Sequence, residues 1–227
     1  MTNGPIIATP SMPSSLSLIA ALTGVAVISG LLVVLTYQVT LPRIAENQRV
    51  ALEKAIFTVL PSATVRSNLL VEADTLTVLP PEEIEAANVF AGYTDMGALV
   101  GFALNGEARG YQDVVRILYG YAPDRECVIG MTVLQSSETP GLGDKVENDP
   151  DFLANFNCLE ARLNAEGTSM RHEIVTVQHG KKTEPWQIDG ISGATVTSTA
   201  IGRALRNSTR EMLPALVSQV HRLEGRP

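Results

Sequence analysis

Hydroxyl and glycine residues gather in the stretch DGISGATVTSTA, which begins at Asp189. Ser192, Gly193 and Thr195 precede an apolar pattern of helical period that begins near Thr197. A helix N-terminus exposes free N–H groups and a partial positive charge, so it binds phosphate well. One hydroxyl residue is enough for an ordinary helix cap. The surplus of hydroxyls leaves two interpretations open at this stage, a cap and an anion site.

A second glycine-rich stretch, ETPGLGDK, runs from Glu138 to Lys145 and follows a predicted strand. Pro140 fixes one backbone dihedral, while Gly141 and Gly143 allow positive φ and a close approach of the backbone to a ligand. Such a loop can simply reverse the chain, which is the commoner outcome. It can also bring bare amides against a flat ring or an anion.

Other chemistries have little support in the residue types. GISG at 190–193 is not a GxSxG nucleophile elbow, and no acid–histidine pairing lies nearby. The three histidines are scattered, and Cys127 and Cys158 lack zinc spacing, so we predict no protein-bound metal. A disulfide would suit an extracytoplasmic domain, but Cys127 lies in a strand-like run where a buried thiol is commoner. We therefore expect both cysteines to be free.

Charge is distributed unevenly along the chain. The net charge of −7, the absence of a basic cluster and the 5% aromatic content argue against nucleic-acid binding. Residues 1–42 contain no Lys, Arg, Asp or Glu, and Leu18 to Tyr37 are nearly all apolar. A helix of about 20 such residues spans about 30 Å, the thickness of the hydrocarbon core of a bilayer. The run is too long and lacks the basic flank of a signal peptide, so we predict a transmembrane helix.

Mixed strands and helices without regular βαβ alternation predict an α+β class, with an antiparallel meander at its centre. Asn105-Gly106 is a strong hairpin signal, Pro81 suits a first helical turn, and Pro214 should kink or break the last helix. We expect helices over 46–60, 149–163 and from 197, and strands over 99–104, 110–121, 127–134 and 174–178. The predicted organisation is an N-terminal tail (1–15), a transmembrane helix (16–41), a connecting region (42–95), the main domain (96–216) and a C-terminal tail (217–227).

The residues from Asp189 to Thr195 resemble the flavin-attachment motif D-x-x-[ST]-G-A-[ST]. With ETPGLG before it, in the right order, the chain is similar to the FMN-binding domain of the Rnf complex G subunit, a domain that the Nqr C subunit shares. The resemblance covers about residues 16–216, and GDK at 143–145 and the modest length favour Rnf G over Nqr C. The Pro/Ser-rich first 15 residues and FNCLEARLNAEG depart from the family but contain no motif position.

The resemblance implies a covalent FMN, esterified through its phosphate to Thr195 by a flavin transferase that uses FAD as donor. Asp189 would position metal or substrate during attachment. Ser192, Gly193 and Ala194 would shape the loop. Thr197 and Ser198 would cap the helix and support the phosphate. The loop residues Glu138, Thr139, Gly141, Leu142 and Gly143 would pack against the isoalloxazine, with Leu142 on its face, and Trp186 is a further expected neighbour.

The resemblance also implies a role and a location. The chain would be an electron relay in a membrane-bound translocase that couples ferredoxin/NAD⁺ chemistry to H⁺ or Na⁺ transport. Its partners would be the other membrane subunits, the transferase and the lipid bilayer, with no nucleic acid. The main domain would lie on the periplasmic side of the inner membrane, although Arg43, Arg49 and Lys54 favour the cytoplasm by the positive-inside rule. An Nqr-type C subunit that passes electrons toward quinone, and a membrane-anchored non-redox domain, remain alternatives.

Overall fold

The computed structural model describes residues 14–72 and 75–223 of the chain. It divides into two units, Met1–Gln48 and Arg49–Pro227. The predicted N-terminal tail falls almost entirely outside the described residues, as do the last four residues of the predicted C-terminal tail. The proposed domain boundaries stay predictions.

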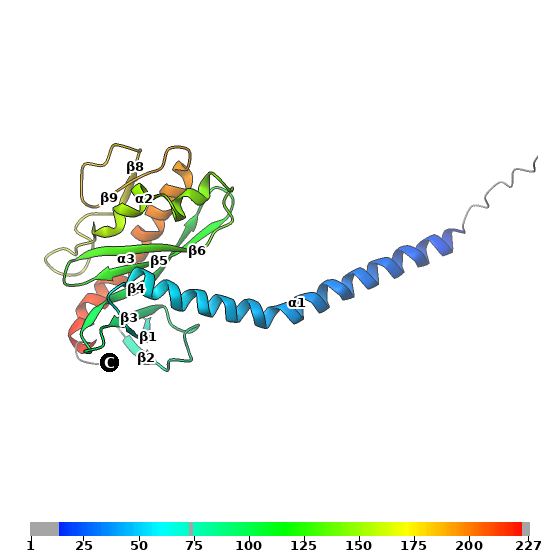
Figure 1. Cartoon of the computed structure of the whole chain (residues 1–227), viewed down its shortest axis with the longest axis horizontal. Coiled ribbons are helices and arrows are strands. Elements are labelled where there is room, and N and C mark those ends of the chain that lie inside the picture. The colour runs from blue at the N-terminus through cyan, green and yellow to red at the C-terminus, as the bar shows by residue number, and fades with distance from the viewer. Residues whose placement is uncertain (1–13, 73–74, 224–227) are drawn as a thin grey trace, which may run out of the picture. The chain divides into compact units, whose positions relative to one another are not determined.

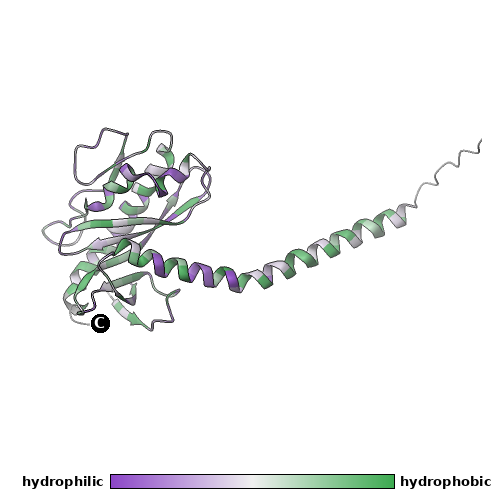
Figure 2. Ribbon diagram, viewed as in Figure 1, coloured by the Kyte–Doolittle hydropathy of each residue, from purple (hydrophilic) through white to green (hydrophobic). Residues whose placement is uncertain are grey.

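The first unit contributes most of one long helix, α1 (Ser15–Val59), which joins the two helices expected over 16–41 and 46–60. Within this unit, the apolar side chains before residue 42 are exposed. Figure 2 shows hydrophobic and neutral residues along the N-terminal half of α1 and strongly hydrophilic ones only in its C-terminal half. The hydroxyls of Thr36 and Thr40 donate to carbonyls four residues earlier, at 2.8 and 2.9 Å, so the helix satisfies these polar groups itself. Among the described helices, α1 alone is long and apolar enough to cross a membrane.

The second unit is built on a seven-stranded antiparallel sheet with the order β2-β1-β3-β4-β5-β6-β7. The predicted meander corresponds to β4, β5 and β6, whereas β1, β2 and β3 were not predicted. The last helix, α3 (Thr195–Leu223), packs along one face of the sheet against β4 and β5 (Figure 1). The strands of the sheet are β1 (Val65–Glu72), β2 (Thr75–Leu79), β3 (Val89–Tyr93), β4 (Leu99–Arg109), β5 (Val114–Ala122), β6 (Cys127–Gln135) and β7 (Leu159–Glu160). A separate parallel pair, β8 (Val175–Val177) and β9 (Gln187–Asp189), lies beside α3.

Alternation along β5 decides which side chains meet α3. The alternate residues Val115, Ile117, Tyr119 and Tyr121 are buried in the main core cluster, as their spacing predicted. Leu118 points to the other face and packs in a second cluster with residues from the end of α1. The sheet therefore has apolar side chains on both faces, and α3 is held by the larger cluster.

The hairpin predicted at Asn105-Gly106 is wrong, because β4 continues through both residues to Arg109. Asn105 pairs with Leu118, and the chain turns at residues 110–113. Gly106 has a packing role instead. A Cβ on Gly106 would lie 3.1 Å from the carbonyl oxygen of Ala204, so glycine lets α3 approach the strand closely.

Two proline-based predictions are also wrong. Residues 81–86 form turns rather than a helix, because the carbonyls of Pro80 and Pro81 accept hydrogen bonds from the Asn68 amide, at 2.9 and 3.2 Å. Pro214 does not break α3. Leu213 and Leu216 on either side of it are fully buried, and their burial offsets the lost helical hydrogen bond.

The expectation of free cysteines is wrong, since Cys127 and Cys158 form a disulfide. The helix expected over 149–163 is also shorter than predicted. It ends as α2 (Pro150–Ala154) and the 3₁₀ turn η2 (Asn155–Asn157), and the chain then becomes β7. Pairing of β7 with the start of β6 places the two cysteines with their Cα atoms 5.2 Å apart.

Candidate functional site

The hydroxyl-rich loop leads from β9 into α3. Gly193 has φ +85°, a conformation that strongly favours glycine, so the loop needs it to turn into the helix. Ser198, in the first turn of α3, ties the loop to the helix. Its hydroxyl accepts from Ile191 N–H at 3.1 Å and donates to the Ala194 carbonyl at 2.9 Å.

The loop hydroxyls are not equivalent. Ser198 is fully buried, and Thr197, 2% exposed, donates to a Glu138 carboxylate oxygen at 2.6 Å. Ser192 and Thr195 are exposed, and of these two only Thr195 lies on the first turn of α3. The first helical hydrogen bond runs from Ser198 N–H to the Ala194 carbonyl. The N–H groups of residues 195–197 therefore have no carbonyl four residues earlier within the helix.

Thr195 lines an open cavity of ≈ 480 Å³, which we name the Thr195 cavity. Large apolar side chains on its wall remain unusually exposed: Tyr111 is 71%, Leu142 50% and Val196 48% exposed. Exposed apolar groups that share a concave site are typical of a wall that contacts a ligand. The cavity is lined by Tyr111, Glu138, Thr139, Leu142, Gly143, Gly193, Ala194, Thr195, Val196 and Thr197.

Glu138, which lines this cavity, binds two other segments of the chain. One carboxylate oxygen accepts from the N–H groups of Tyr111 and Gln112, at 2.9 and 3.0 Å, and the other accepts from Thr197. Burial opposes ionisation of Glu138, but the hydrogen bonds from Thr197, Gln112 and Tyr111 outweigh it, and the pKa lies below its ordinary value. Glu138 is therefore a charged group whose acceptors are engaged by the protein itself.

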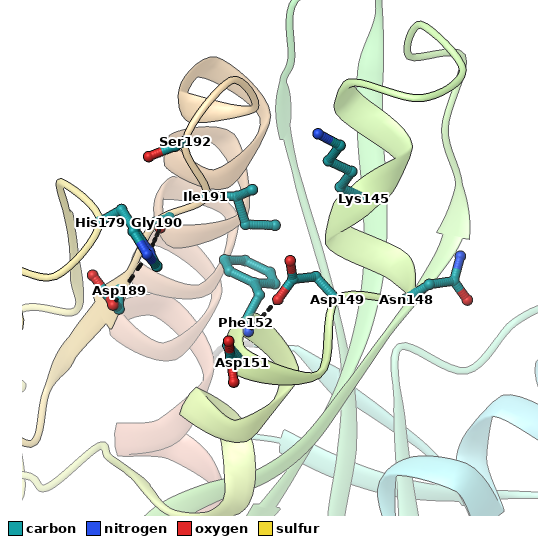
Figure 3. Close-up of a pocket in the computed structure, with 10 residues that line it drawn as sticks. All are labelled: Lys145, Asn148, Asp149, Asp151, Phe152, His179, Asp189, Gly190, Ile191 and Ser192. Carbon is teal, nitrogen blue, oxygen red and sulfur yellow. Dashed lines mark hydrogen bonds and ion pairs between the residues drawn. The ribbon is translucent and has the colours of Figure 1, made fainter.

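The first half of the motif faces a different cavity, the Asp189 cavity, of ≈ 510 Å³ (Figure 3). The Asp189 carboxylate accepts from Gly180 N–H at 2.7 Å and lies 3.6 Å from His179 Nδ1. His179 Nδ1 also lies 3.1 Å from the Gly190 carbonyl. The lining is mixed in charge: Lys145, Asn148, Asp149, Asp151, Phe152, His179, Asp189, Gly190, Ile191 and Ser192.

Asn155 fixes the backbone of Asp189 from both sides. Its side-chain oxygen accepts from Asp189 N–H at 2.9 Å, and its amide donates to the Asp189 carbonyl at 3.2 Å and to the Phe152 carbonyl at 2.9 Å. Lys182 Nζ also donates to the side-chain oxygen of Asn155, at 3.0 Å. The side chain of Asn155 is 6% exposed, so these bonds hold the start of the motif against α2 in a buried setting.

The predicted site residues thus divide into groups. Glu138, Thr139, Leu142, Gly143, Gly193, Ala194, Thr195 and Thr197 line the Thr195 cavity, and Asp189 and Ser192 line the Asp189 cavity. Gly141, Ser198 and Trp186 belong to neither lining. Trp186 stacks on the His172 ring at a centroid distance of 3.8 Å, and His172 Nδ1 lies 3.0 Å from a Glu160 oxygen.

Residues that the motifs did not single out complete both cavities. Tyr111 and Val196 contribute wall surface, and Asn155 fixes the motif backbone. Tyr111 follows Gly110 at a chain reversal, and this position was the feature of the sequence that could have pointed to it. The role of Asn155 depends on a contact 34 residues away in sequence and has no local pattern.

Comparison with known proteins agrees with this geometry. Residues 110–210 match the model of the FMN-binding domain family. The G subunit of the ion-translocating oxidoreductase complex of Shewanella piezotolerans is 29% identical over 78% of this chain and 80% of its own. The G subunit of the Na⁺-translocating ferredoxin:NAD⁺ oxidoreductase complex of Acetobacterium woodii is 34% identical over 53% of this chain and 52% of its own. The solved C subunit of the Na⁺-translocating NADH-quinone reductase from Parabacteroides distasonis superposes with a TM-score of 0.54 at 18% identity, over 82% of this chain and 98% of that chain.

The fold and the match over 110–210 define an FMN-binding domain of α+β class that follows an apolar N-terminal helix. The reported relative that matches most of the chain is a G subunit of an ion-translocating oxidoreductase complex. The chain is similar to the G subunits of ion-translocating oxidoreductase complexes, as its two motifs predicted.

Proposed function

We propose that this chain is an electron-transfer subunit of a membrane-bound, Rnf-type ion-translocating oxidoreductase and carries FMN covalently on Thr195. One observation carries the proposal. Of the two exposed hydroxyls in the attachment motif, only Thr195 lies both on the first turn of α3 and on the wall of an apolar-rimmed cavity.

The Thr195 cavity suits a phosphate that is tethered rather than held by cations. None of the described residues that line it is Lys or Arg. A freely binding FMN brings a phosphate with nearly two negative charges, which proteins usually meet with Arg or Lys. A phosphodiester to a threonine carries one negative charge, and the free N–H groups and dipole of α3 favour that charge. A covalent bond also prevents loss of the cofactor, so weak electrostatic binding is sufficient.

Attachment is a phosphoryl transfer to the threonine hydroxyl. Thr195 Oγ1 would form a bond to the FMN phosphorus of FAD while the pyrophosphate bond breaks. AMP would leave with the bridging oxygen, and the hydroxyl proton would pass to the flavin transferase. The exposure of Thr195 supports this step, because a second protein must reach the hydroxyl.

The apolar wall offers contacts for the flat ring system. Tyr111, Leu142 and Val196 present exposed apolar surface that an isoalloxazine would cover. FMN supplies the redox chemistry, and the protein supplies attachment, orientation and partial shielding from water. Trp186 stays a predicted neighbour, although its stacking on His172 already covers one ring face.

The chain is a membrane-anchored subunit, as its family and α1 indicate. The disulfide supports placing the FMN-binding domain on the periplasmic side, because disulfides persist in oxidising compartments and are rare in the cytosol. This argument opposes the positive-inside count for Arg43, Arg49 and Lys54, which long domains often override. The proposed partners are the other membrane subunits of the complex, which couples ferredoxin/NAD⁺ chemistry to H⁺ or Na⁺ translocation.

Fluorescence in a denaturing gel tests the attachment. Full-length chain from a host with the transferase should give an ultraviolet-excited band at its own mass, and Thr195→Val should give none. Thr199→Val is the matched control, one turn further along α3, and should stay fluorescent. A dark wild-type band would favour a membrane-anchored non-redox domain. A fluorescent T195V band together with a dark T197V band would move the attachment site to Thr197.

A further inference from the structure

Three segments that are far apart in the sequence meet at the carboxylate of Glu138. The turn between β4 and β5 contributes the N–H groups of Tyr111 and Gln112, and α3 contributes the Thr197 hydroxyl. The glycine-rich loop contributes Glu138 itself, which is 8% exposed. We call Tyr111, Gln112, Glu138 and Thr197 the Glu138 cluster.

Two glycines leave room for this carboxylate. A Cβ on Gly110 would lie 2.5 Å from one Glu138 oxygen. A Cβ on Gly143 would lie 2.6 Å from Glu138 Cβ and 3.0 Å from Thr197 Oγ1. A side chain at either position would therefore displace the Glu138 carboxylate or the glycine itself. The glycines that flank the cavity are therefore explained by the position of Glu138, independently of a ligand.

Protein donors occupy three of the about four acceptor sites of the Glu138 carboxylate, so most of its hydrogen-bonding capacity serves the protein itself. Two of its three partners, Tyr111 and Thr197, lie on the cavity wall. Tyr111 presents its side chain there, and Thr197 lies two residues after Thr195 on the same helical turn. The glycine-rich loop that follows Glu138 carries Leu142, the other exposed apolar contact.

We propose that Glu138 is a positioning residue that couples the β4–β5 turn and the glycine-rich loop to the first turn of α3, and so sets where the Tyr111 and Leu142 contacts lie relative to the Thr195 attachment point. This role is distinct from the direct flavin contact that the sequence suggested for Glu138, which stays a prediction. The placement of the flavin contacts rests on the function proposed above. The coupling of the three segments does not depend on that function.

Amide hydrogen exchange tests the coupling without any flavin. The full-length T195V chain in detergent is compared with the same chain carrying Glu138→Ala or Thr197→Val. In E138A, the Tyr111 and Gln112 amides should exchange at least about tenfold faster, since hydrogen bonds to a charged group are lost. In T197V, the same two amides should exchange several-fold faster, although Thr197 bonds neither of them. The Leu118 amide in β5 should keep its rate in both variants. Unchanged Tyr111 and Gln112 rates in either variant, or equal acceleration at Leu118, would overturn the proposal.

Visible circular dichroism of the attached flavin tests the consequence for the cofactor. The circular dichroism signal of each variant is divided by its amount of attached FMN, which intact mass gives. The extent of attachment and the environment of the flavin are thus measured separately. E138A and T197V should each lose at least about half of the signal, because an isoalloxazine that is no longer held becomes symmetrically surrounded. Glu107→Ala is the control, since that carboxylate pairs with Arg116 and does not line the cavity, and it should keep the signal. Full signal in E138A would refute the positioning role, whereas absence of FMN from the wild-type chain would refute the proposed function and leave the exchange result standing.

Discussion

The disulfide gives the most quantitative prediction for stability. It joins Cys127, at the start of β6, to Cys158, which is exposed just before β7, across a sequence separation of 31 residues. The closed loop includes the glycine-rich stretch, α2 and η2. Replacing both cysteines by alanine removes this constraint while β6 and β7 keep their backbone pairing.

The expected loss follows from the length of the loop. In the chain-entropy model, closing a loop of this length removes about 12 cal/mol/K of entropy from the unfolded chain, which is about 3.5 kcal/mol at room temperature. The loop connects the sheet to α2, whose end is fixed to Asp189 by Asn155. Removing the disulfide frees this loop and therefore also weakens the hold of Asn155 on the backbone of the attachment motif.

Urea unfolding of the full-length chain in detergent measures this loss. Trp186 is the only tryptophan of the sequence, and its stacking on His172, which binds Glu160 in β7, makes its fluorescence a probe of this region. The oxidised wild type should exceed C127A/C158A by about 3–4 kcal/mol, and the reduced wild type should match the variant. A difference below about 0.5 kcal/mol would refute the reasoning, and so would two free thiols found by maleimide labelling of the chain in its own membrane.

Three further perturbations test the site. Gly143→Ala should lower the free energy of unfolding by about 1–3 kcal/mol in the same urea assay, because the new Cβ would collide with Glu138. Asn155→Leu should cost about 2–4 kcal/mol and slow attachment of FMN, since the Asp189 backbone loses both partners; attachment at the wild-type rate would contradict the positioning role of Asn155. The pKa of Glu138 is lowered in the folded state, so its stabilisation is complete above the ordinary value of 4.5 and is lost as the pH falls through the lower folded-state pKa. The urea midpoint should consequently fall on acidification in the wild type more than in Glu138→Gln, and parallel pH profiles would contradict this.

Much of the site could be predicted from local sequence. The Asp189–Thr195 motif and the helix that follows it are contiguous, so the helix start beside the motif could be predicted without tertiary structure. The alternation of apolar residues along β5 likewise fixes which face is buried. These features depend on neighbours within a few residues.

The features that sequence reasoning missed depend on distant neighbours. Gly106 sits in a strong hairpin signal, yet α3 packs against it and the strand continues. The cysteine pairing follows from the pairing of β6 with a two-residue strand that has almost no propensity signal of its own. Tyr111 and Asn155 reach the site through contacts with segments tens of residues away.

The central claim is most directly tested by intact mass and peptide mapping of the full-length chain purified from a host with the flavin transferase. The account predicts one adduct with the mass of FMN less one water, located on the peptide that contains Thr195 and absent from Thr195→Val. An unmodified wild-type chain, or an adduct that maps to another residue, would contradict it.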